Sequence, residues 1–278
     1  MKIYLMTDME GVAGVVSFGE WTGPGKPYYP VARELLTGEV NAVVQGLFMG
    51  GAEEVVVCDA HGPGGVNVQD LFPRADYMRG WADQTWPLNL DPSYDAVAWV
   101  GQHAKACTPF GHLCHTQSLE YIDESVNGVS IGEFGELALC AAELGARAVF
   151  ASGDEAFTRE AQALVPGIET VAVKRGLRSG TGEDLDVEAY TRYVGSAIHT
   201  NPVQARSILL EAARNAIKRA LADSSYGHIP PLTPPFSRTV IFRPGPNRPA
   251  KTIMRVAHPT SFIGVMNEWA EATPLEQE

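Results

Sequence analysis

The sequence predicts an α/β protein with a mostly parallel central sheet flanked by helices and a smaller C-terminal α+β portion. Apolar runs with strand character alternate with helical segments through the first two thirds of its 278 residues. This alternation is typical of βαβ units, in which a helix returns the chain so that the next strand lies parallel to the last. Hydrophobic residues make up 45% of the chain and charged residues 19%, so the chain can bury a sizeable core.

The strands are predicted from short apolar runs that end at turn residues or at polar residues. The opening run carries Ile3, Tyr4, Leu5 and Met6, and the second reads EVVVC. In chain order, the expected strands are 2–7, 54–58, 95–101, 146–151, 170–173 and 238–242.

The helices are predicted from apolar residues at helical spacing. The first ends at Gly50-Gly51, and the second begins directly after Gly132. The stretch 187–222 contains Asn201-Pro202 and is therefore at least two helices, because proline removes a helix hydrogen bond and clashes with the preceding turn. The other expected helices are 31–50, 133–144, 155–164 and 262–270.

A proline-rich joint, IPPLTPPFS, separates the first part of the chain from its end. We expect residues 1–226 to form the α/β core that holds the site. Residues 227–278 form either a separate subdomain or the last layer of the same domain, and the sequence leaves both open.

Composition excludes several classes of protein. The formal net charge of −12 argues against nucleic-acid binding, which requires a basic face. No apolar run approaches the roughly 20 residues that span a bilayer, and the N-terminus lacks the apolar stretch of a signal peptide. The four cysteines show no CxxC spacing, so we expect free thiols in a cytoplasmic protein without membrane contact.

Carboxylates and imidazoles follow three of the predicted strands and begin one predicted helix. Asp8 and Glu10 follow the first strand, His61 follows the second, His103 follows the third, and Glu133 opens the helix after Gly132. Because parallel strands end at one edge of a sheet, these side chains are expected to lie close together. Carboxylate and imidazole without thiolate suit a divalent cation such as Zn²⁺ or Mn²⁺.

Each of these residues also has a simpler interpretation. An aspartate at a strand end commonly caps a turn or helix, and a glutamate in a first helical turn is favoured by the helix dipole. Asp59 either orients the ring of His61 or caps its own turn. Asn127-Gly128 is typical of a hairpin turn, and Asn127 is also a candidate for substrate contact.

Six short motifs in order resemble the D-aminopeptidase family of dinuclear zinc peptidases. The family signature S-x-D-x-E-G is matched by Met6–Gly11, with methionine in place of the serine. Further matches are Asp59-Ala60-His61 for D-x-H, Gly101-Gln102-His103-Ala104 for G-x-H-A, Cys114-His115, Gly132-Glu133-Phe134-Gly135 for G-E-x-G, and Pro231-Leu232-Thr233-Pro234-Pro235 for P-L-T-P-P. They extend from Asp8 to Pro235, which is most of the chain.

The resemblance implies a role for each matched residue. Two zinc ions would be held by Asp8, Glu10, His61, His103 and Glu133, with Asp8 bridging both. His115 falls on the catalytic residue, which either attacks the substrate directly or hydrogen-bonds the oxyanion and transfers a proton to the leaving amine.

The resemblance also implies a substrate and an assembly. The substrate would be a short peptide or amide with an N-terminal D-amino acid such as D-Ala, and the protein a homo-oligomer, a decamer with an inner chamber. Two alternatives remain: a dinuclear metallohydrolase of this fold acting on another amide or ester, and a non-catalytic binding or assembly protein.

Overall fold

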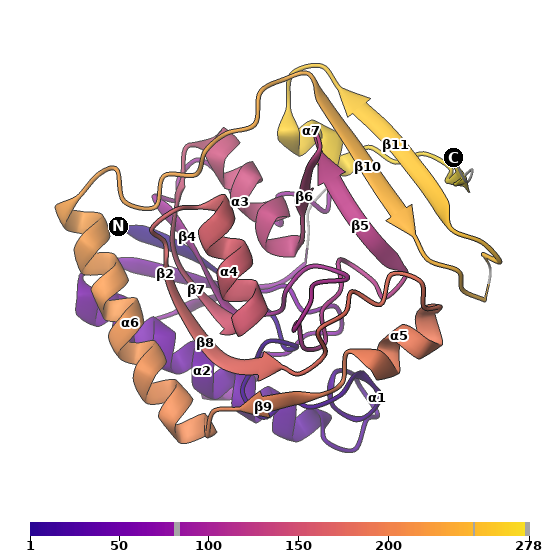
Figure 1. Ribbon diagram of the computed structural model, residues 1–278. Coiled ribbons are helices and arrows are strands. Elements are labelled where there is room, and N and C mark those ends of the chain that lie inside the picture. The colour runs from indigo at the N-terminus through magenta and orange to yellow at the C-terminus, as the bar shows by residue number, and fades with distance from the viewer. Residues whose placement is uncertain (81–83, 247, 276–278) are drawn as a thin grey trace.

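The computed structural model contains two sheets (Figure 1) and describes residues 1–80, 84–246 and 248–275. The larger sheet has the order β3-β2-β1-β4-β7-β8-β9, and its neighbours pair in parallel except β8 with β9. Its strands are β1 (Lys2–Thr7), β2 (Glu54–Asp59), β3 (Asp76–Met78), β4 (Ala96–Gln102), β7 (Arg147–Asp154), β8 (Glu169–Gly176) and β9 (Ala197–His199). The predicted mostly parallel sheet is therefore confirmed.

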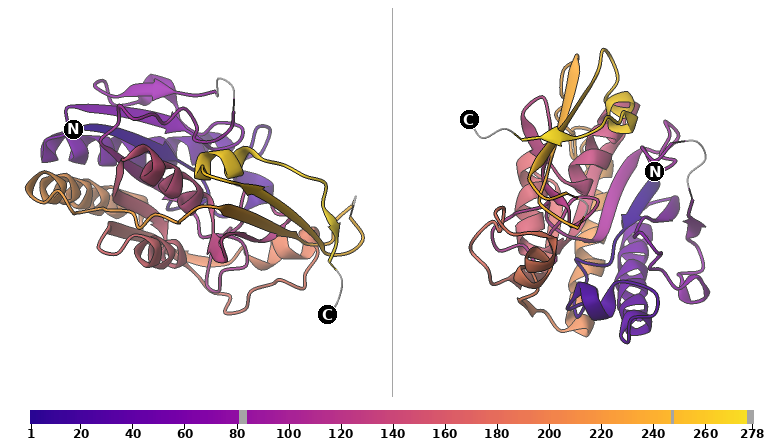
Figure 2. Two further views of the ribbon diagram at one scale, coloured as in Figure 1. Left: turned by 90° about the horizontal axis from the view of Figure 1, so that it is seen from above. Right: turned by 90° about the vertical axis from the view of Figure 1, so that its right-hand side faces the viewer.

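Helices cover both faces of this sheet (Figures 1 and 2). Ile3 and Leu5 of β1 belong to the core that includes α2 and α6, whereas Tyr4 and Met6 belong to the core that includes α3 and α4. This split follows from the alternation of side chains along a strand. The helices are α1 (Phe18–Trp21), α2 (Tyr29–Gly50), α3 (Glu133–Leu144), α4 (Glu155–Leu164), α5 (Val187–Tyr193) and α6 (Pro202–Ala222).

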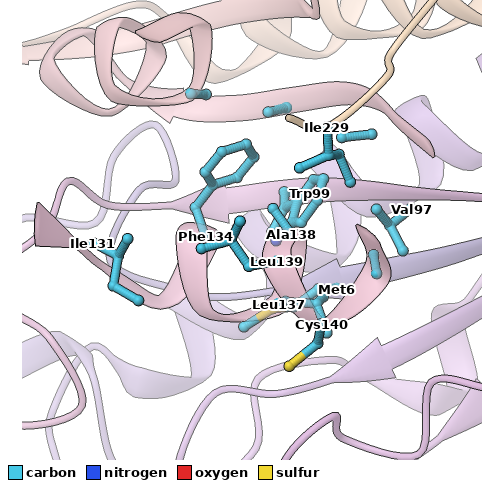
Figure 3. Close-up of a cluster of buried hydrophobic side chains, with 14 of the residues drawn as sticks. Met6, Val97, Trp99, Ile131, Phe134, Leu137, Ala138, Leu139, Cys140 and Ile229 are labelled. Carbon is cyan, nitrogen blue, oxygen red and sulfur yellow. The ribbon is translucent and has the colours of Figure 1, made fainter. Parts of the chain in front are cut away.

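The helix α3, which carries Glu133 at its first position, is fixed to the sheet by a tightly packed apolar face (Figure 3). Phe134 lies against Trp99 of β4, with ring centroids 4.5 Å apart, and both side chains are almost fully buried. Burying a large apolar side chain contributes about 1.5–3 kcal/mol. The position of Glu133 is therefore set by its own helix's contacts with β4.

The smaller sheet is antiparallel, with the order β12-β11-β10-β5-β6. Its strands are β5 (Tyr121–Val126), β6 (Val129–Ile131), β10 (Phe236–Phe242), β11 (Thr252–His258) and β12 (Thr273–Pro274), and α7 (Phe262–Asn267) follows β11. The hairpin predicted at Asn127-Gly128 is confirmed, with φ of 52° and 79°. Because β10 pairs with β5, the C-terminal segment shares a sheet with residues that precede α3.

The stretch 187–222 differs from the prediction. The break at proline is confirmed, since α6 begins at Pro202 with Asn201 capping the amide of Val203. However, α5 ends at Tyr193, and β9 follows as an edge strand that pairs with β8. The closing helix ends at Asn267 rather than at residue 270. Edge pairing is a tertiary interaction that local helical spacing does not report.

Two further observations concern the cysteines and the helices. All four cysteines are free, as the sequence predicts. Over the described ranges, no helix has both the length and the apolar character needed to cross a bilayer.

Parallel register brings three strand ends to one level. Thr7 at the end of β1 pairs with Asp59 of β2 on one side and with Val100 of β4 on the other. The chain then stays close to β4, because the amide of Gly11 donates to the carbonyl of Gly101 at 2.7 Å. A Cβ atom at Gly11 would lie 2.0 Å from the backbone oxygen of Gln102, so only glycine fits there.

This contact predicts the effect of one added methyl group. Gly11→Ala is expected to lower the free energy of unfolding by about 1–3 kcal/mol, because the added carbon meets backbone rather than a movable side chain. Gly19→Ala is the control, since a Cβ there would meet nothing within 4 Å. Urea denaturation of the metal-free protein measures both changes. Equal midpoints for Gly11→Ala and the wild type would contradict the predicted clash.

Candidate metal centre

The predicted ligands meet at the carboxyl ends of β1, β2 and β4. After β1 the chain crosses to β2 on one side, whereas β4 pairs with β1 on the other side. Such a switch point leaves a crevice beyond the strand ends, where open α/β sheets bind ligands. The residues brought together there are Asp8, Glu10, His61, His103, His115 and Glu133.

The first group consists of Asp8, Glu10 and His61, all of them buried. His61 Nδ1 lies 3.0 Å from Asp8 Oδ1 and 3.1 Å from Glu10 Oε2. Its other ring nitrogen, Nε2, lies 3.0 Å from the carbonyl oxygen of Thr22. The loop after β1 and the loop after β2 thus place two carboxylates against one imidazole.

The second group consists of His103, His115 and Glu133. His103 Nε2 lies 3.6 Å from Glu133 Oε2, and His115 Nε2 lies 4.0 Å from Glu133 Oε1. The two imidazole rings are stacked, with centroids 3.9 Å apart. His115 Nδ1 donates to the carbonyl of Leu113 at 2.9 Å, since a carbonyl oxygen only accepts.

Asp8 joins the two groups through its two carboxylate oxygens. Oδ1 lies 3.0 Å from His61, and Oδ2 lies 3.0 Å from His103 Nε2. Gln102 supports the same carboxylate, because its amide nitrogen lies 3.3 Å from Asp8 Oδ2 and 3.4 Å from Glu133 Oε2. One carboxylate therefore faces both groups, which is the geometry of a bridging ligand.

Burial and charge shift the pKa values in this cluster. Burial alone raises the pKa of Asp8, but hydrogen bonds from His103 and His61 outweigh it and hold that pKa well below its ordinary value. Burial lowers the pKa of His61, yet Glu10 and Asp8 raise it to about 12. Burial also lowers the pKa of His103, while Glu133 and Asp8 raise it well above its ordinary value. Burial and the charge of His103 lower the pKa of His115.

The donor set fits divalent cations. Three carboxylates and three imidazoles without thiolate are ligands of Zn²⁺ and Mn²⁺. Glu10 Oε2 and His103 Nε2 are buried, and apart from the neighbouring side chains of the cluster (3.1 Å to His61 Nδ1 and 3.0 Å to Asp8 Oδ2) they have no hydrogen-bond partner among the described residues. Buried polar atoms are normally satisfied, so these two atoms point to a partner such as a cation.

Asp59 and Asn127 occupy different settings. Asp59 accepts hydrogen bonds from the amides of Gly65 and Val66, so it caps the turn that carries His61, whose ring nitrogens lie against Asp8 and Thr22 instead. Asn127 is exposed, and its side-chain amide donates to the carbonyls of Thr233 and Pro235. These contacts give Asn127 a role in anchoring the proline-rich joint, and a substrate contact for it stays a prediction.

Two residues that support the cluster were not predicted from the sequence. Gln102 stands next to His103 in the matched motif, and its bonds to two acids appear only in the fold. Lys174 lies on β8, is buried, and donates to the backbone carbonyls of Glu10 and Val15. A lysine in an apolar strand indicates a buried acceptor, but the sequence does not identify that acceptor as the backbone of Glu10.

The cluster opens into a cavity of about 520 Å³. Asp8, Glu10, His61, His115 and Glu133 line it, and its apolar wall consists of Met6, Phe18, Ala60, Pro63, Trp86, Leu88 and Leu119. A separate cavity of about 870 Å³, lined in part by Phe110 and Arg175, contains none of the clustered acids or histidines. The smaller cavity is therefore the one that belongs to the metal centre.

Comparison with known proteins agrees with this fold. The family model described as D-aminopeptidase, peptidase family M55, matches residues 1–243. The D-aminopeptidase of Bacillus subtilis (strain 168) is 28% identical over 237 residues, which are 84% of this chain and 78% of that protein. The solved structure of the Zn-dependent D-aminopeptidase DppA from Bacillus subtilis, described as a self-compartmentalizing protease, superposes with a TM-score of 0.78 at 22% identity, covering 96% of this chain and 95% of that one.

The fold and the comparisons thus define a peptide hydrolase of the metallo-aminopeptidase class, built on a mostly parallel α/β sheet. The chain belongs to the D-aminopeptidase family M55, whose model covers most of its length. The family resemblance drawn from the six short motifs is confirmed.

The raised pKa values of the two candidate ligand histidines predict proton release on metal binding. Below its raised pKa, metal-free His61 carries a proton, and so does His103. Since a metal ligand must be a neutral imidazole, each histidine loses its proton as a cation binds, and affinity increases with pH. Calorimetric titration with Zn²⁺ in two buffers of different ionisation enthalpy is expected to show about two protons released per two cations. Affinity that does not change between pH 6 and 8, with no proton release, would contradict this assignment.

Proposed function

We propose that this protein is a dinuclear zinc aminopeptidase that removes an N-terminal D-amino acid, such as D-Ala, from short peptides or amides. The observation that carries the proposal is the position of Asp8, whose two oxygens face His61 and His103 in two separate groups. Family membership supports the D-amino acid, and the zinc dependence of the structurally similar Bacillus protein supports the metal.

The proposed ligands divide between two cations. Asp8, Glu10 and His61 would hold one, and Asp8, His103 and Glu133 would hold the other. Bound there, the cations would supply hydroxide at neutral pH and a Lewis acid for the scissile carbonyl. Gln102 keeps the carboxylates of Asp8 and Glu133 aligned through its side-chain amide.

His115 is proposed to act as the proton shuttle. Its lowered pKa keeps the ring neutral at pH 7, and the bond from Nδ1 to Leu113 leaves the lone pair on Nε2. A lone pair accepts a proton, so the neutral ring cannot donate to an oxyanion until it has taken one up. We infer that His115 Nε2 takes a proton from the attacking water and gives it to the leaving amine.

The cavity supports a small apolar N-terminal residue. Met6, Trp86 and Leu88 line it beside the proposed ligands, so a methyl group such as that of D-Ala would face apolar carbon. Met6 stands two residues before Asp8 and points to the same side of β1.

Assembly and location are part of the proposal. The structurally similar Bacillus protein is described as self-compartmentalizing, which supports a homo-oligomer, and we propose a decamer. The four free cysteines favour a reducing compartment, and we propose the cytoplasm.

Metal content and stereoselective hydrolysis test the proposal together. Purified protein is expected to contain close to two zinc ions per chain and to release p-nitroaniline from D-Ala p-nitroanilide but not from the L isomer. A chelator should abolish release, and zinc should restore it. Two metals with no release would retain the site and favour a hydrolase for another amide or ester. Protein without metal would refute the centre itself.

Asp8→Ala provides the mutational arm of the same test. Because one carboxylate serves both groups, the variant is expected to lose both zinc ions or to hold one loosely. Asp184→Ala is the control, since that side chain is 86% exposed and pairs with Lys251 away from the site. Normal zinc content in Asp8→Ala would refute the bridging role.

His115→Ala separates catalysis from metal binding. The variant is expected to keep two zinc ions and to lose kcat by about 10²–10⁴-fold, the usual contribution of a general acid–base group. Loss of one zinc would instead make His115 a ligand of the group that it forms with His103 and Glu133. In the wild type, a burst of amine release would indicate direct attack by His115 rather than proton transfer.

A further inference from the structure

The catalytic cavity contains one basic side chain whose role is not explained by metal binding. Among the described residues that line the cavity, Arg79 is the single lysine or arginine. It stands one residue after β3, next to Gly80, and reaches back over the turn that carries His61. An arginine at this place, 32% exposed, can meet a substrate.

The guanidinium of Arg79 is held in a fixed orientation. Nη1 donates to the carbonyls of Asp59 and His61 at 2.7 and 3.0 Å, and Nη2 donates to the carbonyl of Gly62 at 2.7 Å. These bonds use three of the five N–H groups of an arginine. The other two make no hydrogen bond with the described residues, so they remain available to a ligand.

The charge of Arg79 is only partly neutralised. The three acceptors are neutral carbonyls, and in the described part of the chain the carboxylate at ion-pair distance is Asp59, whose Oδ1 lies 3.7 Å from Nη1. The oxygens of Asp59 already accept from Gly65, Val66 and Tyr77. Arg79 therefore has both positive charge and two N–H groups to offer to an anion.

We propose that Arg79 binds the C-terminal carboxylate of the substrate, which makes dipeptides and tripeptides with a free C-terminus the preferred substrate class. This inference rests on the proposed aminopeptidase function. Arginine recognises carboxylates with its planar fork, and such charge-assisted bonds are the strong ones.

Arg79 bonds the backbone of a proposed metal ligand and lines the same cavity, so a peptide held at the metals needs few residues to reach it. Nη1 lies 3.0 Å from the backbone oxygen of His61, whose side chain is a proposed ligand. An extended dipeptide spans about 7 Å and a tripeptide about 10 Å. A peptide held by its N-terminus at the metals would therefore place its carboxylate near Arg79 only if it is short. Longer peptides would have to pass this residue.

Two substrates that differ only at the C-terminus test the proposal. The zinc-loaded wild type is expected to hydrolyse D-Ala-D-Ala with a kcat/KM roughly 10- to 100-fold above that for D-Ala-D-Ala amide, in line with a hydrogen bond to a charged group. In Arg79→Gln this ratio should fall to within about threefold of one. Arg192→Gln is the matched control, because that exposed side chain pairs with Glu188 outside the cavity, and it should keep the wild-type ratio.

A second variant and a binding measurement keep the result interpretable. Arg79 also holds the turn of His61, so zinc content is measured in every variant. Arg79→Lys retains the charge without the fork and should keep part of the preference. Calorimetric binding of the reduced-bond analogue of D-Ala-D-Ala and of its amide gives the same ratio without catalysis.

The outcomes separate the two proposals. Acid-selective binding without hydrolysis of either substrate would refute the aminopeptidase function and retain the carboxylate site. Equal hydrolysis and equal binding of acid and amide by the wild type would overturn the role of Arg79.

Discussion

Two buried carboxylates one residue apart are the constraint on which this structure depends. Asp8 and Glu10 are each 4% exposed at the end of a core strand, where unpaired charges are costly. Positive charge has to come from elsewhere in the chain or from a cation. Parallel pairing of β1 with β2 and β4 brings His61 and His103 to the same edge, so the register of the sheet places two imidazoles beside these carboxylates.

Close backbone packing lets these side chains approach one another. A Cβ at Gly11 would lie 2.0 Å from the oxygen of Gln102, and one at Gly153 would lie 1.7 Å from it. Gly101 has φ of +74°, a conformation that favours glycine. The glycines in D-x-E-G and G-x-H-A therefore bring the β1 loop against the end of β4, and Gly153 lets β7 approach the same end. Gln102 then reaches both Asp8 and Glu133 with its side-chain amide.

Strand ends and helix starts could be read from the sequence because they depend on local pattern. The EVVVC strand, the start of α3 at Glu133 and the break at Pro202 are all found as predicted. The edge strand β9 and the pairing of β10 with β5 could not, since they depend on contacts between distant segments. The same limit applies inside the site: Asp59 was known to precede His61, but only the fold shows that it binds the amides of Gly65 and Val66. No sequence pattern marks Arg79, because its hydrogen-bond acceptors are backbone carbonyls.

Polar contacts connect the C-terminal segment with the candidate metal centre. Glu133 Oε1 accepts the amide of Gln117 at 2.8 Å, and the side chain of Gln117 donates to Glu136 at 2.6 Å. Burial and the neighbouring Glu124 raise the pKa of Glu136 well above its ordinary value, which favours the neutral form of this carboxyl.

Arg238 on β10 forms an ion pair with Glu124 at 2.8 Å, and both side chains are buried. A buried pair of this kind is costly to break, because either partner alone would be an uncompensated charge. The smaller sheet therefore lies next to the residues that bond Glu133, although none of its C-terminal strands supplies a proposed ligand. The surroundings of Glu133, a proposed ligand fixed by the packing of α3 on β4, therefore include a residue more than 100 positions later in the chain.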